Sequence, residues 1–248
     1  MSDKKTSWSP QGTYLIVIKP GCVQFLGGES MVPIITLNQG NVESVSMSPC
    51  EKYVLTYAPK ADFGFTVWDF QMVSEIRTFE LEIGETADSF KWSHDGSYIA
   101  KKFKKQLESG RIKEGVTVYE LPSMEIIKDS AQKKTSITIG GIYEWHWAPA
   151  RNMIVYTAHL DEVDENDPEA VAAAPEPKIG FIEVPSRNIV GQIPIKGARQ
   201  LKLTFHPLGN YLAVINKYKI KKSEQYTTEI FDLTKRDSVP QQQIVLDR

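Results

Sequence analysis

The stretch Trp92-Ser93-His94-Asp95-Gly96-Ser97-Tyr98-Ile99 is one of five copies of a pattern that decides the fold. The pattern is an aromatic or apolar residue, then a short polar turn, then an apolar pair. The other copies lie at 8–15, 47–54, 147–154 and 205–212. Their Ser, Pro, Asp, Asn and Gly residues favour turns, and the flanking residues favour strands. Each copy therefore predicts two β-strands joined by a tight turn.

A second recurrent block follows each copy and predicts a third strand. These blocks lie at 23–26, 67–70, 118–121, 181–184 and 230–233. A turn and a fourth strand come next, and the chain length that varies between repeats falls mainly between the second and third strands. Four short strands in a repeat of about 40 to 45 residues are typical of a WD40-like β-propeller, whose blades bury their faces against one another.

We therefore predict an all-β propeller domain over 1–248. About five four-stranded blades are visible, at approximately 3–38, 41–84, 86–131, 142–196 and 199–247. The tryptophans Trp8, Trp92 and Trp147 recur at the end of the first strand, so we interpret them as packing residues of the blades.

Composition limits the classes of function. The formal net charge is −2, so any contact with nucleic acid or an anionic membrane must be local. The longest apolar runs have five residues, too few to span a bilayer, and the N-terminus does not resemble a secretory signal. Cys22 and Cys50 form neither a disulfide framework nor a zinc motif. We expect a cytoplasmic protein with no membrane partner.

Catalytic motifs are missing from the sequence. It contains no nucleophile elbow, HExxH, phosphate-binding loop or dinucleotide-binding glycine motif, and no histidine pair has metal-ligand spacing. We therefore expect a non-enzymatic protein without catalytic residues, metal, cofactor or small-molecule substrate. A rigid docking platform is the class of function that remains.

Two basic stretches between second and third strands form the candidate site. They contain Lys101, Lys102, Lys104, Lys105, Arg111 and Lys113 in the third repeat, and Lys217, Lys219, Lys221 and Lys222 in the fifth. In a propeller such connections emerge on one face, so we predict loops that contact ribosomal or other RNA phosphate in a salt-dependent way. The alternative is that these residues are solvated loop tips.

The corresponding connection of the fourth repeat is acidic rather than basic. Residues 160–178 are also rich in Ala and Pro, and we expect a flexible insert there. This segment lacks the Gly and the terminal Glu of a calcium-binding loop, so we do not interpret it as a metal site.

Several pieces of the sequence carry a resemblance to a known family. They are Trp8-Ser9-Pro10-Gln11-Gly12-Thr13-Tyr14-Leu15, Gly27-Gly28-Glu29, Ser48-Pro49-Cys50-Glu51-Lys52-Tyr53, Phe90-Lys91-Trp92-Ser93-His94-Asp95-Gly96-Ser97-Tyr98, Val118-Tyr119-Glu120-Leu121-Pro122-Ser123-Met124, Gly209-Asn210-Tyr211-Leu212-Ala213-Val214 and Glu229-Ile230-Phe231-Asp232. Over nearly its whole length the chain resembles the propeller region of the b subunit of eukaryotic translation initiation factor 3. The third and fourth pieces are distinctive, because generic WD repeats do not share them.

The resemblance implies a non-catalytic scaffold subunit with a nine-bladed propeller that docks on the small ribosomal subunit. It also implies partners among the a, g and i subunits of the same factor. The chain departs from the family in having five visible blades, no RNA-recognition motif and no helical tail, so we expect part of a larger propeller. Two alternatives stay open. One is the related propeller of initiation factor 2A, which binds initiator tRNA and ribosome, and the other is an unrelated closed propeller that is an enzyme or a ligand-binding protein.

Overall fold

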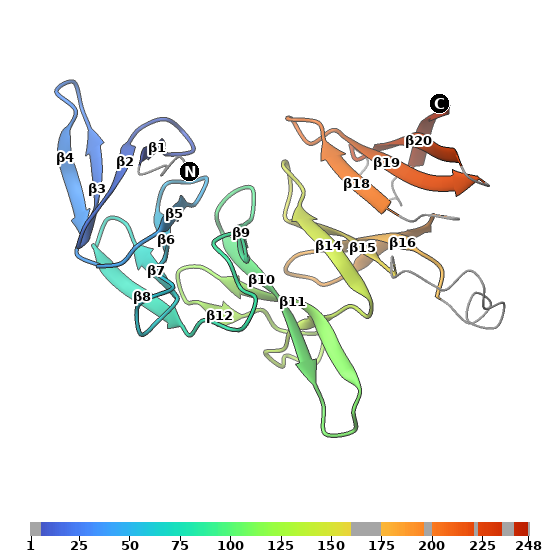
Figure 1. The fold of residues 1–248 in the computed structure, drawn as a ribbon, viewed down its shortest axis with the longest axis horizontal. Coiled ribbons are helices and arrows are strands. Elements are labelled where there is room, and N and C mark those ends of the chain that lie inside the picture. The colour runs from blue at the N-terminus through green and yellow to red at the C-terminus, as the bar shows by residue number, and fades with distance from the viewer. Residues whose placement is uncertain (1–5, 160–174, 196–199, 221–222, 235–240, 248) are drawn as a thin grey trace. The chain divides into compact units, whose positions relative to one another are not determined.

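The computed structural model describes residues 6–159, 175–195, 200–220, 223–234 and 241–247. Every helix or strand assigned within these ranges is a β-strand, as Figure 1 shows. Within the same ranges no helical segment suited to crossing a bilayer is found. Most of the predicted acidic insert at 160–178 lies outside the described residues.

The strands form five antiparallel sheets, which we call blades 1 to 5. Blade 1 contains β1 (Thr6–Trp8), β2 (Leu15–Lys19), β3 (Cys22–Gly27) and β4 (Val32–Leu37), and blade 2 contains β5 (Ser44–Met47), β6 (Tyr53–Tyr57), β7 (Phe65–Asp69) and β8 (Ser74–Phe79). Blade 3 contains β9 (Phe90–Trp92), β10 (Tyr98–Gln106), β11 (Ile112–Glu120), β12 (Glu125–Ile126) and β13 (Ile137–Thr138). Blade 4 contains β14 (Ile142–Trp147), β15 (Met153–Ala158), β16 (Lys178–Glu183) and β17 (Ile189–Pro194), and blade 5 contains β18 (Gln200–Phe205), β19 (Tyr211–Ile220), β20 (Ser223–Asp232) and β21 (Gln241–Asp247). In four blades the strands pair in chain order.

Blade 3 departs from the four-stranded pattern because its outer edge is split. Strand β11 pairs with β12 at Tyr119 and Glu120, and with β13 at Gly115 and Val116. Two short strands thus occupy the place that one continuous fourth strand occupies in the other blades. The sequence pattern, which predicts four strands, does not reveal this fifth strand.

The predicted turn between first and second strands is present in all five blades. A backbone N–H at the start of the turn donates to the carbonyl of the residue five positions later, which lies at or just before the start of the next strand. The donor and acceptor pairs are Ser9 and Tyr14, Ser48 and Tyr53, Ser93 and Tyr98, Ala148 and Met153, and His206 and Tyr211, at 2.8–2.9 Å. In the first three blades the buried Ser hydroxyl also accepts a hydrogen bond from the Tyr N–H, at 2.9–3.0 Å.

The chain divides into two compact units, each with its own core. Unit 1 comprises Met1–Lys101 and Val118–Ile126. In it, Phe25 of blade 1 packs edge-on against Phe70 of blade 2, with ring centroids 4.8 Å apart. Phe65 of blade 2 makes the same kind of contact with Phe90 of blade 3, at 4.9 Å. Within unit 1, blades 1 and 2 thus each bury a face against the next blade along the chain.

Unit 2 comprises Lys102–Thr117 and Ile127–Arg248, and its core joins blades 4 and 5. Phe181 of blade 4 and Leu212, Val214 and Phe231 of blade 5 belong to one buried cluster. Four-stranded antiparallel sheets that pack face to face in chain order are the hallmark of a propeller-like β fold. The predicted all-β, propeller-like architecture is therefore confirmed, while the nine-bladed ring stays a prediction.

The three recurring tryptophans differ in burial. Trp147 is buried, and Trp92 is half-buried with its Nε1 donating to Ser46 Oγ of blade 2 at 2.9 Å. Trp8, however, is 61% exposed, so our interpretation of it as a buried packing residue is wrong. Trp8 lies opposite Leu15, on the side of blade 1 that faces away from blade 2. Its place in the repeat is regular, but its side chain remains in solvent.

Candidate functional site

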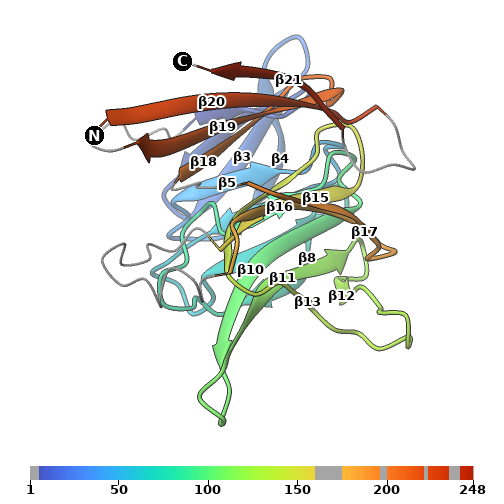
Figure 2. The same ribbon diagram turned by 90° about the vertical axis from the view of Figure 1, so that its right-hand side faces the viewer.

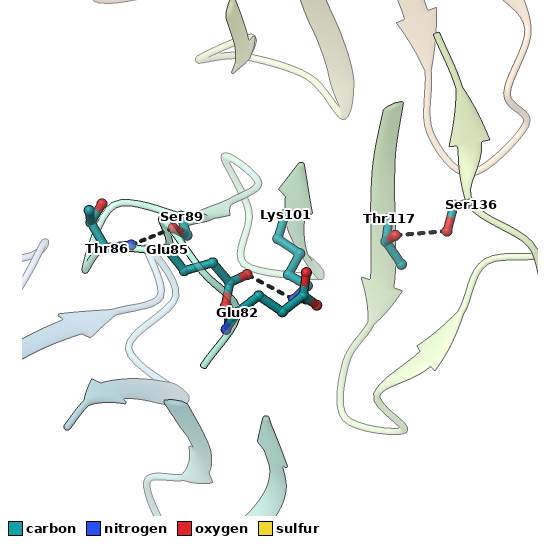
Figure 3. Close-up of polar contacts among 7 residues, drawn as sticks. All are labelled: Glu82, Glu85, Thr86, Ser89, Lys101, Thr117 and Ser136. Atoms are coloured by element: carbon teal, nitrogen blue, oxygen red, sulfur yellow. Dashed lines mark hydrogen bonds and ion pairs between the residues drawn. The ribbon is translucent and has the colours of Figure 1, made fainter. Parts of the chain in front are cut away.

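Lys101, the first residue of the predicted cationic stretch, is a buried ion-pairing residue. Its ammonium donates to Glu82 Oε1 at 2.9 Å and to Glu85 Oε1 at 2.8 Å, as Figure 3 shows. The Lys101 side chain is 7% exposed and that of Glu85 is 11% exposed. Lys101 therefore does not contribute to an exposed cationic surface.

Aromatic rings and charges around Lys101 favour its protonated form. The ammonium lies 5.9 Å from the ring centroid of Phe79 and 5.6 Å from that of Phe90. Burial alone would lower the pKa of Lys101, but the hydrogen bonds and negative charges of Glu82 and Glu85 outweigh it, so the pKa is raised. This ion-pair cluster links blade 3 to the segment that follows blade 2 within unit 1.

The remaining basic residues of the third repeat lie on a projecting β-hairpin rather than in a loop. Strands β10 and β11 have nine residues each, and the tip between them extends beyond the other strands of blade 3 in Figure 2. The tip is closed by Leu107 N–H donating to Arg111 O at 2.8 Å and by Gly110 N–H donating to Leu107 O at 2.9 Å. Gly110 has a φ of 78°, which glycine adopts at little cost. Our prediction of a loop is wrong for most of these residues, because they continue the pairing of β10 with β11. We call residues 102–117 the arm.

Strand alternation separates the arm's charges between its two faces. Because Leu107 pairs with Arg111, the antiparallel register places Lys105 opposite Lys113 and Lys104 opposite Glu114. The face that carries Lys105, Arg111 and Lys113 we call the cationic face, and all three residues are exposed.

The other face of the arm is closer to neutral. It bears Lys104, whose Nζ lies 4.0 Å from Glu114 Oε2. Lys102 is half-buried at the base of the arm and donates to the carbonyl of Ile142 at the start of β14. The arm is therefore charged mainly on one side.

The second basic stretch also lies on a long hairpin. Strands β19 and β20 have ten residues each and pair as far as Ile220 and Ser223, with Lys219 opposite Glu224. Lys217 is half-buried, with its Nζ 5.9 Å from the ring centroid of Tyr226. Lys221 and Lys222 lie outside the described residues.

Sequence reasoning missed a third basic segment, which connects β12 to β13 in unit 2. Lys128, Lys133 and Lys134 are exposed there, and Lys128 forms a backbone bridge with Lys134. Asp129 accepts hydrogen bonds from the N–H groups of Ala131 and Lys133, both at 2.9 Å. These bonds lower the pKa of Asp129. The adjacent Lys133 and Lys134 were visible in the sequence, but the segment lies outside the second-to-third-strand connections that we considered.

The metal-ligating and thiol side chains of the described residues do not form a cluster. Among them, no group of three or more His, Cys, Asp or Glu side chains could hold a metal ion. Cys22 and Cys50 are free thiols. His146 pairs with Glu144 at 2.6 Å, and its ring packs edge-on against Phe205, with centroids 6.2 Å apart. His146 thus contributes to packing between blades 4 and 5.

The geometry defines the chain as a propeller-like β protein with long basic hairpins. No protein-family model matches it. Solved structures that are similar in fold include the following two. One, described as a eukaryotic initiation factor, has a TM-score of 0.68 at 17% identity and covers 98% of this chain and 55% of that one. The other, dihydro-heme d1 dehydrogenase NirN, has a TM-score of 0.55 at 13% identity and covers 96% of this chain and 45% of that one. At these identities the likeness shows the fold alone.

Sequence similarity is more specific than the likeness in fold, and it confirms the resemblance to the b subunit of initiation factor 3. The chain is similar to the b subunit of eukaryotic translation initiation factor 3 from Culex quinquefasciatus (27% identity, 93% of this chain and 31% of that protein), Dictyostelium discoideum (28%, 97% and 34%) and Drosophila melanogaster (27%, 99% and 34%). It thus spans about a third of the length of these relatives.

Proposed function

We propose that this chain is a non-catalytic scaffold component of a translation initiation factor assembly of the factor 3 type. In this role it helps to dock the assembly on the small ribosomal subunit, in the cytoplasm. The observation that carries the proposal is similarity to the b subunit of that factor along 93–99% of the chain rather than at an isolated motif. A propeller-like fold is consistent with it, because stacked blades provide rigid surfaces for docking.

Two classes of partner follow from the proposal. The first is other subunits of the same factor, with a, g and i expected from the resemblance. The second is the small ribosomal subunit, including its proteins and its RNA. The exposed cations on the arm and between β12 and β13 support an RNA contact, because exposed Lys and Arg attract phosphate.

The experiment that tests the proposal is purification of the tagged chain from its own cells at low salt. The lysate is first separated on a sucrose gradient, and co-purifying proteins are identified by mass spectrometry. We expect small-subunit ribosomal proteins and factor 3 subunits in the same fractions. An untagged lysate and a tagged unrelated propeller of similar size serve as controls.

Two outcomes would contradict the proposal. Recovery of the chain free of ribosomes, as a compact monomer, would favour a closed propeller with a ligand of its own. Recovery with initiator tRNA and ribosomes, but without any factor 3 subunit, would favour the propeller of the initiation factor 2A type.

A further inference from the structure

The cationic face of the arm concentrates positive charge in a small area. Lys105 and Lys113 lie opposite each other on β10 and β11, a position at which like charges destabilise a strand pair. Arg111 lies two residues before Lys113 on the same strand, about 7 Å away along it. None of the three forms an ion pair with a described residue. The repulsion is therefore not relieved within the arm.

Folding of the arm does not require these three charges. The backbone pairing and the turn at Gly110 close the hairpin, and the buried Val116 anchors its base. The opposite face shows that charge can be balanced in the same hairpin, because Lys104 lies opposite Glu114 there. The three cations are thus a surface feature that an anionic ligand would stabilise.

The composition of the cationic face favours a nucleic-acid backbone over a protein partner. Protein interfaces usually have an apolar centre surrounded by a polar rim. On the cationic face the large aliphatic side chain is Leu107, which lies at the tip and is 39% exposed, and Phe103 at the base is half-buried. The centre of this face is therefore charged rather than apolar. Arg binds phosphate oxygens in bidentate fashion and Lys binds them as a point charge, so the three residues suit successive phosphates.

We propose that the cationic face of the arm binds the phosphate backbone of single-stranded or looped RNA without reading its sequence. The inference rests on the proposed function, in which ribosomal RNA is the physiological ligand. A single strand or loop suits this face better than a duplex, because its flexible backbone can bring successive phosphates to the three side chains. Binding should therefore depend strongly on salt and little on base composition.

The test measures binding of the full chain to a fluorescent 20-nucleotide uridine RNA by anisotropy, from 50 to 300 mM KCl. The variant is Lys105→Gln/Arg111→Gln/Lys113→Gln. Its control is Lys19→Gln/Lys52→Gln/Lys60→Gln, which removes three exposed lysines of unit 1 and changes the net charge equally. A second control, Lys104→Gln, alters the other face of the arm. Circular dichroism and the thermal midpoint establish that each variant is folded.

We expect the arm variant to bind RNA about 10- to 50-fold more weakly at 150 mM KCl. Its slope of log affinity against log salt should be smaller by about 2, because each phosphate contact to a single strand contributes about 0.7. Both controls should stay within about threefold of the parent chain. Equal losses in the arm variant and the unit 1 control would overturn the proposal, since net charge would then explain binding.

A polyglutamate peptide of 20 residues serves as the competing probe. If it binds the parent chain as tightly as RNA does, and the arm variant loses both, the face is an acidic-protein site and the proposal is wrong. The gradient experiment separates this inference from the proposed function. Retained co-sedimentation with factor 3 subunits by a chain that does not bind the RNA probe would overturn the inference alone.

Discussion

Arg187 of blade 4 is hydrogen-bonded to Thr135 in the segment that connects β12 to β13 of blade 3. Its Nη1 donates to Thr135 Oγ1 at 2.9 Å, and its Nη2 donates to the carbonyls of Thr135 and Ile127. The guanidinium thus joins blade 4 to the connection between β12 and β13, both of which belong to unit 2.

We predict that Arg187→Met lowers the free energy of unfolding by about 2 to 4 kcal/mol. The substitution leaves two partly buried carbonyls and a hydroxyl without the donor that Arg187 supplies. An unsatisfied group costs about 1 to 3 kcal/mol when it is fully buried, and less when it is partly exposed. Urea denaturation followed by tryptophan fluorescence measures the change. The matched control is Arg111→Met, which removes an exposed arginine and should change stability by less than about 0.5 kcal/mol. Equal losses of unfolding free energy in the two variants would show that the hydrogen bonds of Arg187 do not contribute to stability.

Lys101 provides a second test, because its charge balances two carboxylates. We expect Lys101→Met to lower the free energy of unfolding by about 3 kcal/mol, since the largely buried carboxylate of Glu85 loses its cationic partner. The raised pKa of Lys101 means that its contribution is present below the ordinary lysine pKa and lost only as pH rises through the higher folded value. The difference in free energy of unfolding between the variant and the parent chain, measured by urea denaturation, should therefore be constant from pH 7 to pH 9. Adding Glu82→Gln and Glu85→Gln should recover much of the loss, and Lys105→Met should be nearly neutral.

Gly115 of β11 pairs with Thr138 of β13 and leaves no room for a side chain. A Cβ added there would lie 1.9 Å from the carbonyl oxygen of Ile137, and the φ of Gly115 is 156°. We predict that Gly115→Ala separates β13 from β11 and costs at least about 2 kcal/mol. Hydrogen exchange should show faster exchange at the Ile139 amide, which donates to Glu114 O at 2.9 Å. The control is Gly140→Ala, whose Cβ would meet nothing within 4 Å. Slow exchange at Ile139 in the Gly115 variant would contradict the prediction.

Glu229 gives a pH-dependent prediction. It lies opposite Val214 on the apolar side of blade 5, where burial raises the pKa of its carboxyl. A raised carboxyl pKa means that ionisation destabilises the fold above that pKa, and that the penalty disappears as pH falls below the unfolded value. Glu229→Gln should therefore raise the thermal midpoint at pH 7 and leave it unchanged at pH 3. The exposed Glu75→Gln should show no such difference, and a lower midpoint at pH 7 for the Glu229 variant would contradict the argument.

The sequence predicted the blades well because the turn chemistry is local. Ser9, Ser48 and Ser93 each bond to the tyrosine five residues later, so the pattern and the turn it forms lie within one short window. Burial could not be predicted in the same way. Trp8 and Trp147 occupy equivalent positions in the repeat, yet Trp8 is exposed and Trp147 is buried. Burial depends on which groups from elsewhere in the chain cover a side chain, and the repeat pattern does not carry that information.

The candidate site was predicted only in part. Composition located the basic stretches, but a run of lysines does not show which members are paired. Lys101 is paired with Glu82 and Glu85, which are 19 and 16 residues away in sequence. The separation of Lys105 from Lys104 onto opposite faces requires the register that the turn at Gly110 fixes. Neither the pairing of Lys101 nor the placement of Lys104 and Lys105 on opposite faces can be recognised from the residues next to them in the sequence.

The turn at Gly110 also constrains how the arm can change in length. A hairpin satisfies its own backbone hydrogen bonds, so adding one residue pair to both strands together would disturb nothing in the blade below it. Each such addition, however, moves the tip residues to the opposite face, since side chains alternate along a strand. Related chains with arms that differ by an even number of residues in each strand should therefore keep their tip charges on the same side, and an odd difference should reverse that side.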